Sequence, residues 1–163
     1  MGARTPALVL RVPMVLGEDD HAAIALRARA RSTRTLLVGG GASLEQPIYA
    51  GDVTEAIVRG LEAPGLDDVA LDLAGPESLT HRALVARAAV LLGGRPPRVI
   101  PLPRVIAFAG AWLAERLLAD PPVTRAMLGV LDHDDRVDPA DACRRLGITL
   151  TPLDETLRRC LAR

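Results

Sequence analysis

The sequence predicts an α/β fold in which a few strands are followed by a mostly helical C-terminal part. Residues 7–12, Ala-Leu-Val-Leu-Arg-Val, are a largely apolar run of strand length that ends at Pro13. Apolar runs without alternation are typical of parallel strands that are covered on both faces. In the last third of the chain, capping residues repeatedly precede short segments with apolar residues at helical spacing. Strands combined with such helices indicate a sheet with helices packed on it.

The first half of the chain should alternate strands and helices. Asp19 and Asp20 precede an alanine- and arginine-rich segment from His21 to about Ser32, and carboxylates there favour the positive end of a helix dipole. Residues 36–38 are expected to form a short strand, and the three glycines 39–41 a turn or loop.

A second helix should follow the short strand that begins at Gln46. Asp52 and Glu55 have the spacing of a capping box, so we expect Asp52 to be the N-cap of this helix. Apolar residues recur there at i, i+3, i+4, i+7 and i+8, which places one stripe against a core. The stripe consists of Val53, Ala56, Ile57, Gly60 and Leu61.

The remaining elements follow from similar local signals. Apolar and acidic residues alternate over residues 69–73, as in a strand with one solvent-exposed face. Thr80 can cap the helix that follows, and Gly93 and Gly94 should end it. Residues 98–100 should be extended, and residues 104–118 should form the longest helix. Three short helices are then expected to start at Thr124, at Asp138 with Pro139, and at Thr151 with Pro152, the second of them ending at Gly147.

Composition excludes several chemistries. The 163 residues are 49% hydrophobic and 25% charged, which is ordinary for one globular domain, and the formal net charge is zero. A neutral chain has no bulk attraction to nucleic acid or to an anionic membrane, so any basic patch must be local. All 20 basic residues are arginine, so a Schiff-base lysine or a phosphate-binding Walker lysine is excluded.

The cysteines and the hydropathy pattern point to the cytoplasm. Cys143 and Cys160 have neither the spacing of a metal site nor the density of a disulfide scaffold. The longest apolar stretch, residues 105–114, is well short of the ~20 residues that a membrane span needs. We therefore expect a cytoplasmic protein without membrane insertion and without a nucleic-acid partner.

Two segments carry a family resemblance. Residues 46–53, Gln-Pro-Ile-Tyr-Ala-Gly-Asp-Val, resemble the Gln-Pro-Val-His-Val-x-Asp-Val segment of extended short-chain dehydrogenase/reductases, and residues 75–80, Gly-Pro-Glu-Ser-Leu-Thr, resemble their Gly-Pro-Glu-x-Leu-Thr turn. Residues 10–17 are similar to the Arg-Pro-x-x-Val-x-Gly run after the sixth strand of that family, with one residue inserted. The later segments 121–131, 146–148 and 151–155 resemble one branch, the bacterial relatives of the complex I NADH dehydrogenase alpha-subcomplex accessory subunit.

The resemblance implies the C-terminal portion of an NAD(P)-binding Rossmann-like fold, in the NAD-dependent epimerase/dehydratase family. It implies a single unit over residues 1–163, with 1–94 as the remnant of the Rossmann-like sheet and its helices and 95–163 as a mostly helical subdomain. NAD or NADP would be the cofactor of the full-length family. The loop after the sixth strand passes near the nicotinamide in that family, so Pro13, Met14 and Val15 are implied to face the cofactor, and Gln46 and Tyr49 to border the substrate cleft. The bland alternative is that Pro13 only ends a strand and that Tyr49 only packs into the core.

Two motifs of the family are missing. The glycine-rich turn that holds the dinucleotide pyrophosphate is absent, and the only tyrosine, Tyr49, is followed four residues later by Val53 and not by a lysine. We therefore expect no catalytic residue here and no tight binding of NAD(P) by this chain alone.

Other clusters in the sequence suit solvated surfaces better than sites. Arg27, Arg31 and Arg34 share a helical face that could meet a phosphate, although a solvated face is the commoner reading. Residues 18–21 and 132–135 hold acidic residues and histidine, but contiguous residues rarely converge on one metal ion, so no metal site is expected.

Three hypotheses of different classes follow. The chain is the substrate-side portion of an oxidoreductase or epimerase whose N-terminal half lies elsewhere, through a separate polypeptide or a truncation. Alternatively, it is a non-catalytic accessory or interaction module that docks on a partner protein, because unpaired strand edges are sticky. The third possibility is a small independent binding protein.

Overall fold

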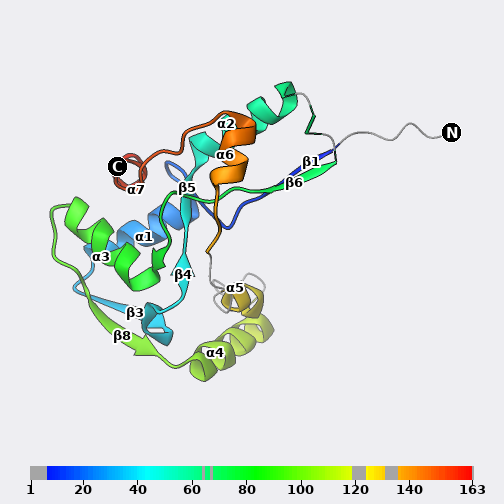
Figure 1. Ribbon diagram of the computed structural model, residues 1–163. Helices are drawn as coiled ribbons and strands as arrows, with labels where there is room; N and C mark the ends of the chain where they lie inside the picture. Colours follow the sequence, from blue (N-terminus) through cyan, green and yellow to red (C-terminus); the bar gives the residue numbers. More distant parts are fainter. Residues whose placement is uncertain (1–6, 64, 67, 119–123, 131–135, 163) are drawn as a thin grey trace. The chain divides into compact units, whose positions relative to one another are not determined.

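The computed structural model describes residues 7–63, 65–66, 68–118, 124–130 and 136–162. These form a mixed α/β fold with parallel strand pairs and helices, as predicted (Figure 1). The chain divides into two compact units of interleaved segments. Unit 1 contains residues 1–24, 46–78 and 136–163, and unit 2 contains residues 25–45 and 79–135. This division does not follow the boundary at residue 94 that the sequence suggested, because the last two helices fall in unit 1; that the chain is a single domain stays a prediction.

Two parallel strand pairs form the sheet elements of unit 1. Strand β1 (Leu8–Arg11) pairs with β6 (Val69–Asp72), from Leu8 opposite Val69 to Arg11 opposite Asp72. Strand β2 (Met14–Leu16) pairs with β5 (Pro47–Tyr49). The predicted strands 7–12 and 69–73 are thus confirmed, and the first of them is parallel as expected.

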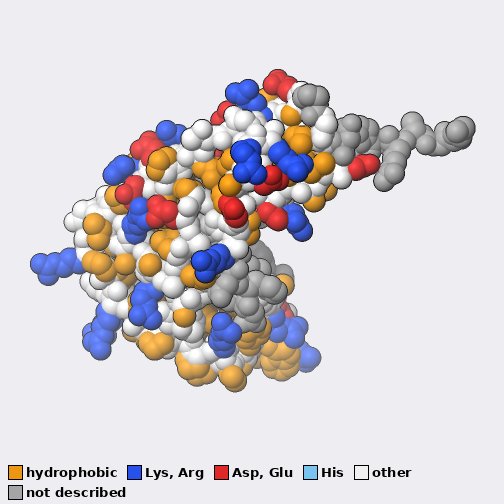
Figure 2. Space-filling model, viewed as in Figure 1, with side chains coloured by type: hydrophobic (Ala, Val, Ile, Leu, Met, Phe, Trp, Pro, Cys, Tyr) orange, Lys and Arg blue, Asp and Glu red, His pale blue; other side chains and the backbone are white. Residues whose placement is uncertain are grey.

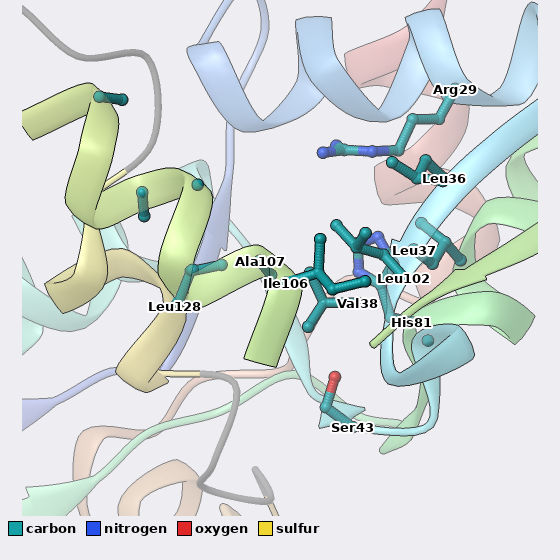
Figure 3. A pocket seen from close by; sticks show the side chains of 14 residues that line it. Arg29, Leu36, Leu37, Val38, Ser43, His81, Leu102, Ile106, Ala107 and Leu128 are labelled. Carbon is teal, nitrogen blue, oxygen red and sulfur yellow. The ribbon is translucent and has the colours of Figure 1, made fainter. Parts of the chain in front are cut away.

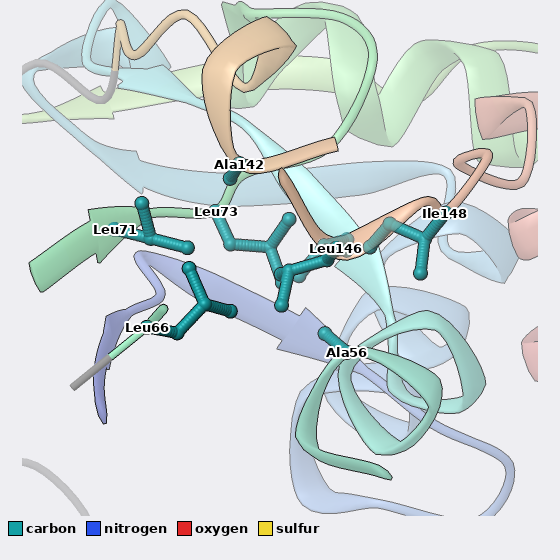
Figure 4. Close-up of a cluster of buried hydrophobic side chains, with 8 residues drawn as sticks. Ala56, Leu66, Leu71, Leu73, Ala142, Leu146 and Ile148 are labelled. Atoms are coloured by element: carbon teal, nitrogen blue, oxygen red, sulfur yellow. The ribbon is translucent and has the colours of Figure 1, made fainter. Parts of the chain in front are cut away.

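One face of the β1–β6 pair is covered by helices of unit 1, α2 (Ala50–Glu62) and α6 (Ala140–Leu146). The core on this face consists of apolar side chains from both strand pairs, from these helices and from the loops beside them (Figure 4). Its members are Ile48, Ala56, Leu66, Leu71, Leu73, Ala142, Leu146 and Ile148. The remaining helix of unit 1 is α7 (Leu153–Leu161).

The other face of β1 differs from the expectation that both faces are covered. Val9 is 52% exposed, and Ala70 on β6 is exposed as well. Among the described residues, β6 is the only strand that pairs with β1. The sequence of β1 is therefore typical of a strand covered on both faces, but the described part of the chain covers only the face that packs on α2 and α6.

Helix α2 starts earlier than the sequence indicated. Its first residue is Ala50, and Tyr49 is the N-cap without a side-chain bond. Asp52 therefore lies inside the first turn, and the prediction that it caps the helix is wrong. The predicted apolar stripe is correct for Val53 and Ala56, but Ile57 is 51% exposed and Leu61 84% exposed, because the buried side continues toward Gly60 and Ala63.

The described residues of unit 2 form one parallel and one antiparallel strand pair. Strand β3 (Arg34–Val38) is parallel to β8 (Arg98–Leu102), and β4 (Leu44–Glu45) is antiparallel to β7 (Leu79–Thr80). The three glycines after β3 form the 3₁₀ turn η1 (Gly39–Gly41), where all three have positive φ values of 58°, 69° and 70°. Glycine adopts these angles without the steric cost that a side chain adds.

In the described part of unit 2, three helices belong to this unit alone, and a fourth is shared with unit 1. These are α3 (His81–Leu91), α4 (Arg104–Leu117) and α5 (Arg125–Val130), while α1 (His21–Arg31) begins in unit 1 and continues into unit 2. The Thr80 hydroxyl accepts a hydrogen bond from the Ala83 N–H at 3.2 Å, so the predicted cap of α3 is confirmed. Helix α4 is the longest of the described helices, as predicted. No helix in the described ranges has the length and apolar content of a bilayer span.

Candidate functional site

The structure brings the predicted cofactor-facing and substrate-facing segments side by side. Pro13 lies in the bend between β1 and β2, and Met14 and Val15 belong to β2. Because β2 and β5 are parallel, Met14 lies opposite Pro47 and Leu16 opposite Tyr49. Pro13 and Met14 are half-buried and Val15 is 38% exposed. Whether these residues face a cofactor stays a prediction.

Gln46 is a buried bridge between distant segments of unit 1. Its side-chain amide donates to the Gly75 carbonyl at 2.7 Å and to the Val137 carbonyl at 2.8 Å, and its oxygen accepts from the Val137 N–H at 2.8 Å. Only 4% of the residue is exposed. With both amide hydrogens donated, the side chain has little capacity left for a substrate.

Tyr49 presents its hydroxyl to an acid at the surface of unit 1. The hydroxyl donates to Glu18 at 2.6 Å, and the guanidinium of Arg159 lies 5.1 Å from the ring centroid. The hydrogen bond to Glu18 raises the pKa of the phenol, and Arg159 partly opposes this. Tyr49 is therefore protonated at neutral pH and acts as a hydrogen-bond donor, not as a base.

Asp20 and the two cysteines of unit 1 have structural roles. The Asp20 carboxylate accepts hydrogen bonds from the N–H groups of Gly17 and Ala23 at 2.7 and 2.5 Å. Within the acidic cluster 18–21, Asp20 thus marks the start of helix α1, in agreement with the structural interpretation of this cluster. Burial raises the pKa of the Cys143 thiol, and it raises the pKa of Cys160 to about 12. Neither thiol is an activated nucleophile. The cluster 132–135 lies outside the described residues.

Unit 2 holds a cavity that the sequence did not indicate. Its volume is about 460 Å³, and it lies among α1, β3, β8, α4, α5 and the start of α3 (Figure 3). The walls are mostly apolar and include Leu37, Leu102, Ile106 and Leu128. A cavity of this size, apolar with a few polar groups, is typical of a small-molecule site, for which volumes of about 300–1,000 Å³ are usual.

Among the described residues, three polar side chains line this cavity: Arg29, Ser43 and His81. The His81 Nδ1 lies 2.5 Å from the Glu45 carboxylate, so Nδ1 carries the proton and Nε2 remains for a ligand. The pair is mostly buried, with side-chain exposures of 19% and 13%. Sequence reasoning missed it because Glu45 and His81 are 36 residues apart and meet only through the two-residue pairing of β4 with β7. It also singled out Arg27, Arg31 and Arg34, whereas Arg29 is the arginine that faces the cavity.

No family model and no curated protein sequence matches this chain. Solved structures do match. The human epimerase family protein SDR39U1, solved with NADPH, has a TM-score of 0.71 and 22% sequence identity, over 100% of this chain and 50% of that protein. The UDP-glucose 4-epimerase of Thermus thermophilus, solved with NAD, has a TM-score of 0.66 and 16% identity, over 96% of this chain and 46% of the epimerase. RMD from Pseudomonas aeruginosa, complexed with NADPH, has a TM-score of 0.65 and 16% identity, over 95% and 47% of the two chains.

These similarities establish the fold. The chain has part of a Rossmann-like NAD(P)-binding fold and spans about half the length of each matched structure. At such low identities, the activities of those proteins do not transfer with the fold.

Proposed function

We propose that this chain is the substrate-side portion of an NAD(P)-dependent oxidoreductase or epimerase-like protein. The dinucleotide-binding half is supplied from outside these 163 residues, by a longer form of the polypeptide or by a separate chain. Alone, the chain binds no NAD(P) tightly and is not catalytically competent, because it lacks the glycine-rich turn and the tyrosine–lysine pair of the active family members.

The observation that carries the proposal is the exposed face of strand β1. Parallel strands belong to sheets that are covered on both faces, yet Val9 is 52% exposed and β1 has a single described neighbour strand. The matched NAD(P)-binding structures are about twice as long as this chain. A missing half that pairs a strand with the edge of β1 and packs a helix on the face that carries Val9 accounts for both facts.

Within this proposal, Pro13, Met14 and Val15 lie toward the nicotinamide, and Tyr49 borders the substrate. Their adjacency on β2 and β5 supports this assignment, since groups that contact one reacting centre must lie close together. Gln46 is the weakest member of the set, because its amide is already engaged by Gly75 and Val137. It holds the neighbouring segment in place for the site.

The test is a fluorescence titration of NADH with the chain alone and with the polypeptide encoded immediately upstream. We expect no binding by the chain alone and binding when both are present. Val9→Lys should abolish this complementation, whereas Ile57→Lys, at an equally exposed apolar position on α2, should not. Tight NADH binding by the chain alone, or an upstream region with no strand-turn-helix unit in any frame, would overturn the proposal.

A second candidate is a non-catalytic accessory module, similar in role to the complex I accessory subunit that the sequence resembles. The apolar surface of α4 favours it: Val105 is 80% exposed and Leu117 73% exposed. Figure 2 shows apolar side chains at the surface over this helix, with arginines beside them. If the reconstituted two-part protein binds NADH but remains inactive on every substrate class of the matched enzymes, while it co-purifies with one partner protein through α4, this second function is the correct one.

A further inference from the structure

We propose that the cavity of unit 2 binds a small apolar molecule that carries one anionic head group, such as a medium-chain carboxylate, with room for an oxygen at its other end. This inference does not rest on the proposed function, because all the described lining residues belong to unit 2.

The apolar body of the ligand would lie against aliphatic walls. Leu37 and Leu102 come from the adjacent strands β3 and β8, and Ile106 and Ala107 come from helix α4 (Figure 3). These walls offer no hydrogen bonds, so a sugar or another polyhydroxylated molecule would lose its hydration without compensation. An alkyl chain gains roughly 0.8 kcal/mol for each buried CH₂ group.

Arg29 selects the charge of the head group. It is half-buried in the last turns of α1, and Figure 3 shows its guanidinium extending over the open space of the cavity. No carboxylate among the described residues pairs with it. A half-buried guanidinium without a counter-ion favours an anionic ligand, because charge-assisted hydrogen bonds to a carboxylate restore its lost solvation.

The surroundings strengthen this preference. The described part of unit 2 contains eleven arginines but only two acidic residues, Glu45 and Glu115. Glu45 is engaged by His81, and Glu115 accepts a hydrogen bond from Arg125 at 2.7 Å. Over all of unit 2, residues 25–45 and 79–135, the sequence holds eleven arginines and six acidic residues, so this unit carries a positive formal charge although the whole chain is neutral, and its field attracts anions.

His81 and Ser43 supply the polar groups away from Arg29. Because Nδ1 of His81 is engaged by Glu45, Nε2 is the ring nitrogen left for a ligand, and the Ser43 hydroxyl can donate or accept. In Figure 3, Arg29 and Ser43 lie at opposite ends of the set of lining side chains. A hydroxyl at the far end of the ligand therefore finds a partner.

The test is calorimetric titration of the full 163-residue chain with decanoate, 1-decanol, decylamine and 10-hydroxydecanoate. Decanoate should bind at least tenfold more tightly than decylamine, and 10-hydroxydecanoate should bind no more weakly than decanoate. Arg29→Gln should weaken decanoate about tenfold or more, as expected for loss of a charge-assisted hydrogen bond. Arg31→Gln, an exposed neighbour on the same helix that does not line the cavity, should change it less than twofold.

A second pair of variants tests the location without disturbing the fold. Gly110 lines the cavity from α4, and a side chain added there meets no atom within 4 Å. Gly110→Leu should fill the space and abolish decanoate binding. Gly129→Leu, on α5 with equally open surroundings but outside the lining, should leave binding unchanged. Circular dichroism shows whether both variants keep the helical content of the parent.

Binding to phosphatidylglycerol vesicles distinguishes ligand binding in the cavity from membrane binding at the surface of α4. The vesicles present acyl chains and anionic head groups as a bilayer and not as free molecules. Equal affinity for decanoate and decylamine, no effect of Gly110→Leu, or binding to vesicles without binding of free decanoate would each overturn the proposal. The last result would assign the apolar surface of α4 to a membrane.

Discussion

The Asp52 carboxylate accepts two hydrogen bonds from Thr151, one from its backbone N–H and one from its hydroxyl, both at 2.7 Å. The two residues are 99 positions apart in sequence. Asp52 is only 6% exposed, and Thr151 immediately precedes Pro152, the N-cap of helix α7. This pair fixes the last helix of the chain to the first turn of α2.

Asp52→Ala should therefore lower the free energy of unfolding by about 2–4 kcal/mol. The substitution removes two hydrogen bonds to a charged acceptor and leaves the Thr151 N–H without its partner. Urea denaturation followed by circular dichroism measures the effect. The matched control is Glu55→Ala, on an exposed face of the same helix, where the 3.6 Å pair with Arg59 is worth only about 0.3–0.5 kcal/mol. Equal losses for the two variants would contradict a structural role for Asp52.

Gln46→Leu should also destabilise the chain, by about 2–3 kcal/mol, since a side chain of similar size remains while Gly75 and Val137 lose three hydrogen bonds. A residue that only contacted substrate would show no such loss. The same denaturation experiment decides between the two roles, and Gln46→Glu adds a check. The glutamate cannot donate to the two carbonyls, so it should not restore stability at neutral pH.

These pairs show which features the sequence could predict. The Thr80 cap and the left-handed Gly147 that ends α6 were both correct, because each depends on residues within one helical turn. Asp52 also carried a local signal, the capping box with Glu55. Instead, the carboxylate accepts hydrogen bonds from Thr151, 99 residues away, and the helix starts at Ala50, three residues before the start at Val53 that an Asp52 cap would give.

The cavity could not be predicted from the sequence for the same reason, because its polar residues are distant from one another along the chain. Arg29, Glu45 and His81 stand on α1, β4 and the start of α3, and no spacing along the chain relates them. Segments 46–53 and 75–80 were more informative about the fold than about chemistry. Gly75 N–H donates to the Gln46 carbonyl at 3.3 Å, so the two segments contact each other through their backbones.

Gly75→Ala should be among the most damaging single substitutions in the chain. A Cβ at this position would lie 1.7 Å from the Pro47 carbonyl oxygen, so the backbone of β5 must shift. We expect the free energy of unfolding to fall by more than about 2 kcal/mol, in the range of overpacked or strained sites.

Gly110→Ala should have the opposite effect, because residue 110 lies in a helix and the added methyl group meets no atom within 4 Å. It should stabilise the chain by about 0.5–1 kcal/mol in thermal melts. A stable, cooperative Gly75→Ala variant would show that β5 does not pack against residue 75 as described.

The pKa of Tyr49 reports the surroundings of its hydroxyl at the end of β5, the strand that pairs with β2. Tyr49 is the only tyrosine, so absorbance at 295 nm during an alkaline titration reports this phenol alone. Its pKa lies above the ordinary value of 10.0, chiefly because the hydroxyl donates to Glu18. Glu18→Gln should lower this pKa and Arg159→Gln should raise it further, since the guanidinium favours the phenolate.

Because the pKa of Tyr49 is raised in the folded state, the stability that comes from its hydrogen bond is fully present below the pKa of the unfolded state. This stability is lost as the pH rises through the pKa of the folded state. Stability should thus fall above about pH 10, and Glu18→Gln should reduce the contribution of Tyr49 to that fall. If both variants shift the pKa in the same direction, the phenol is not held between Glu18 and Arg159, and the proposed position of Tyr49 beside the substrate loses its structural support.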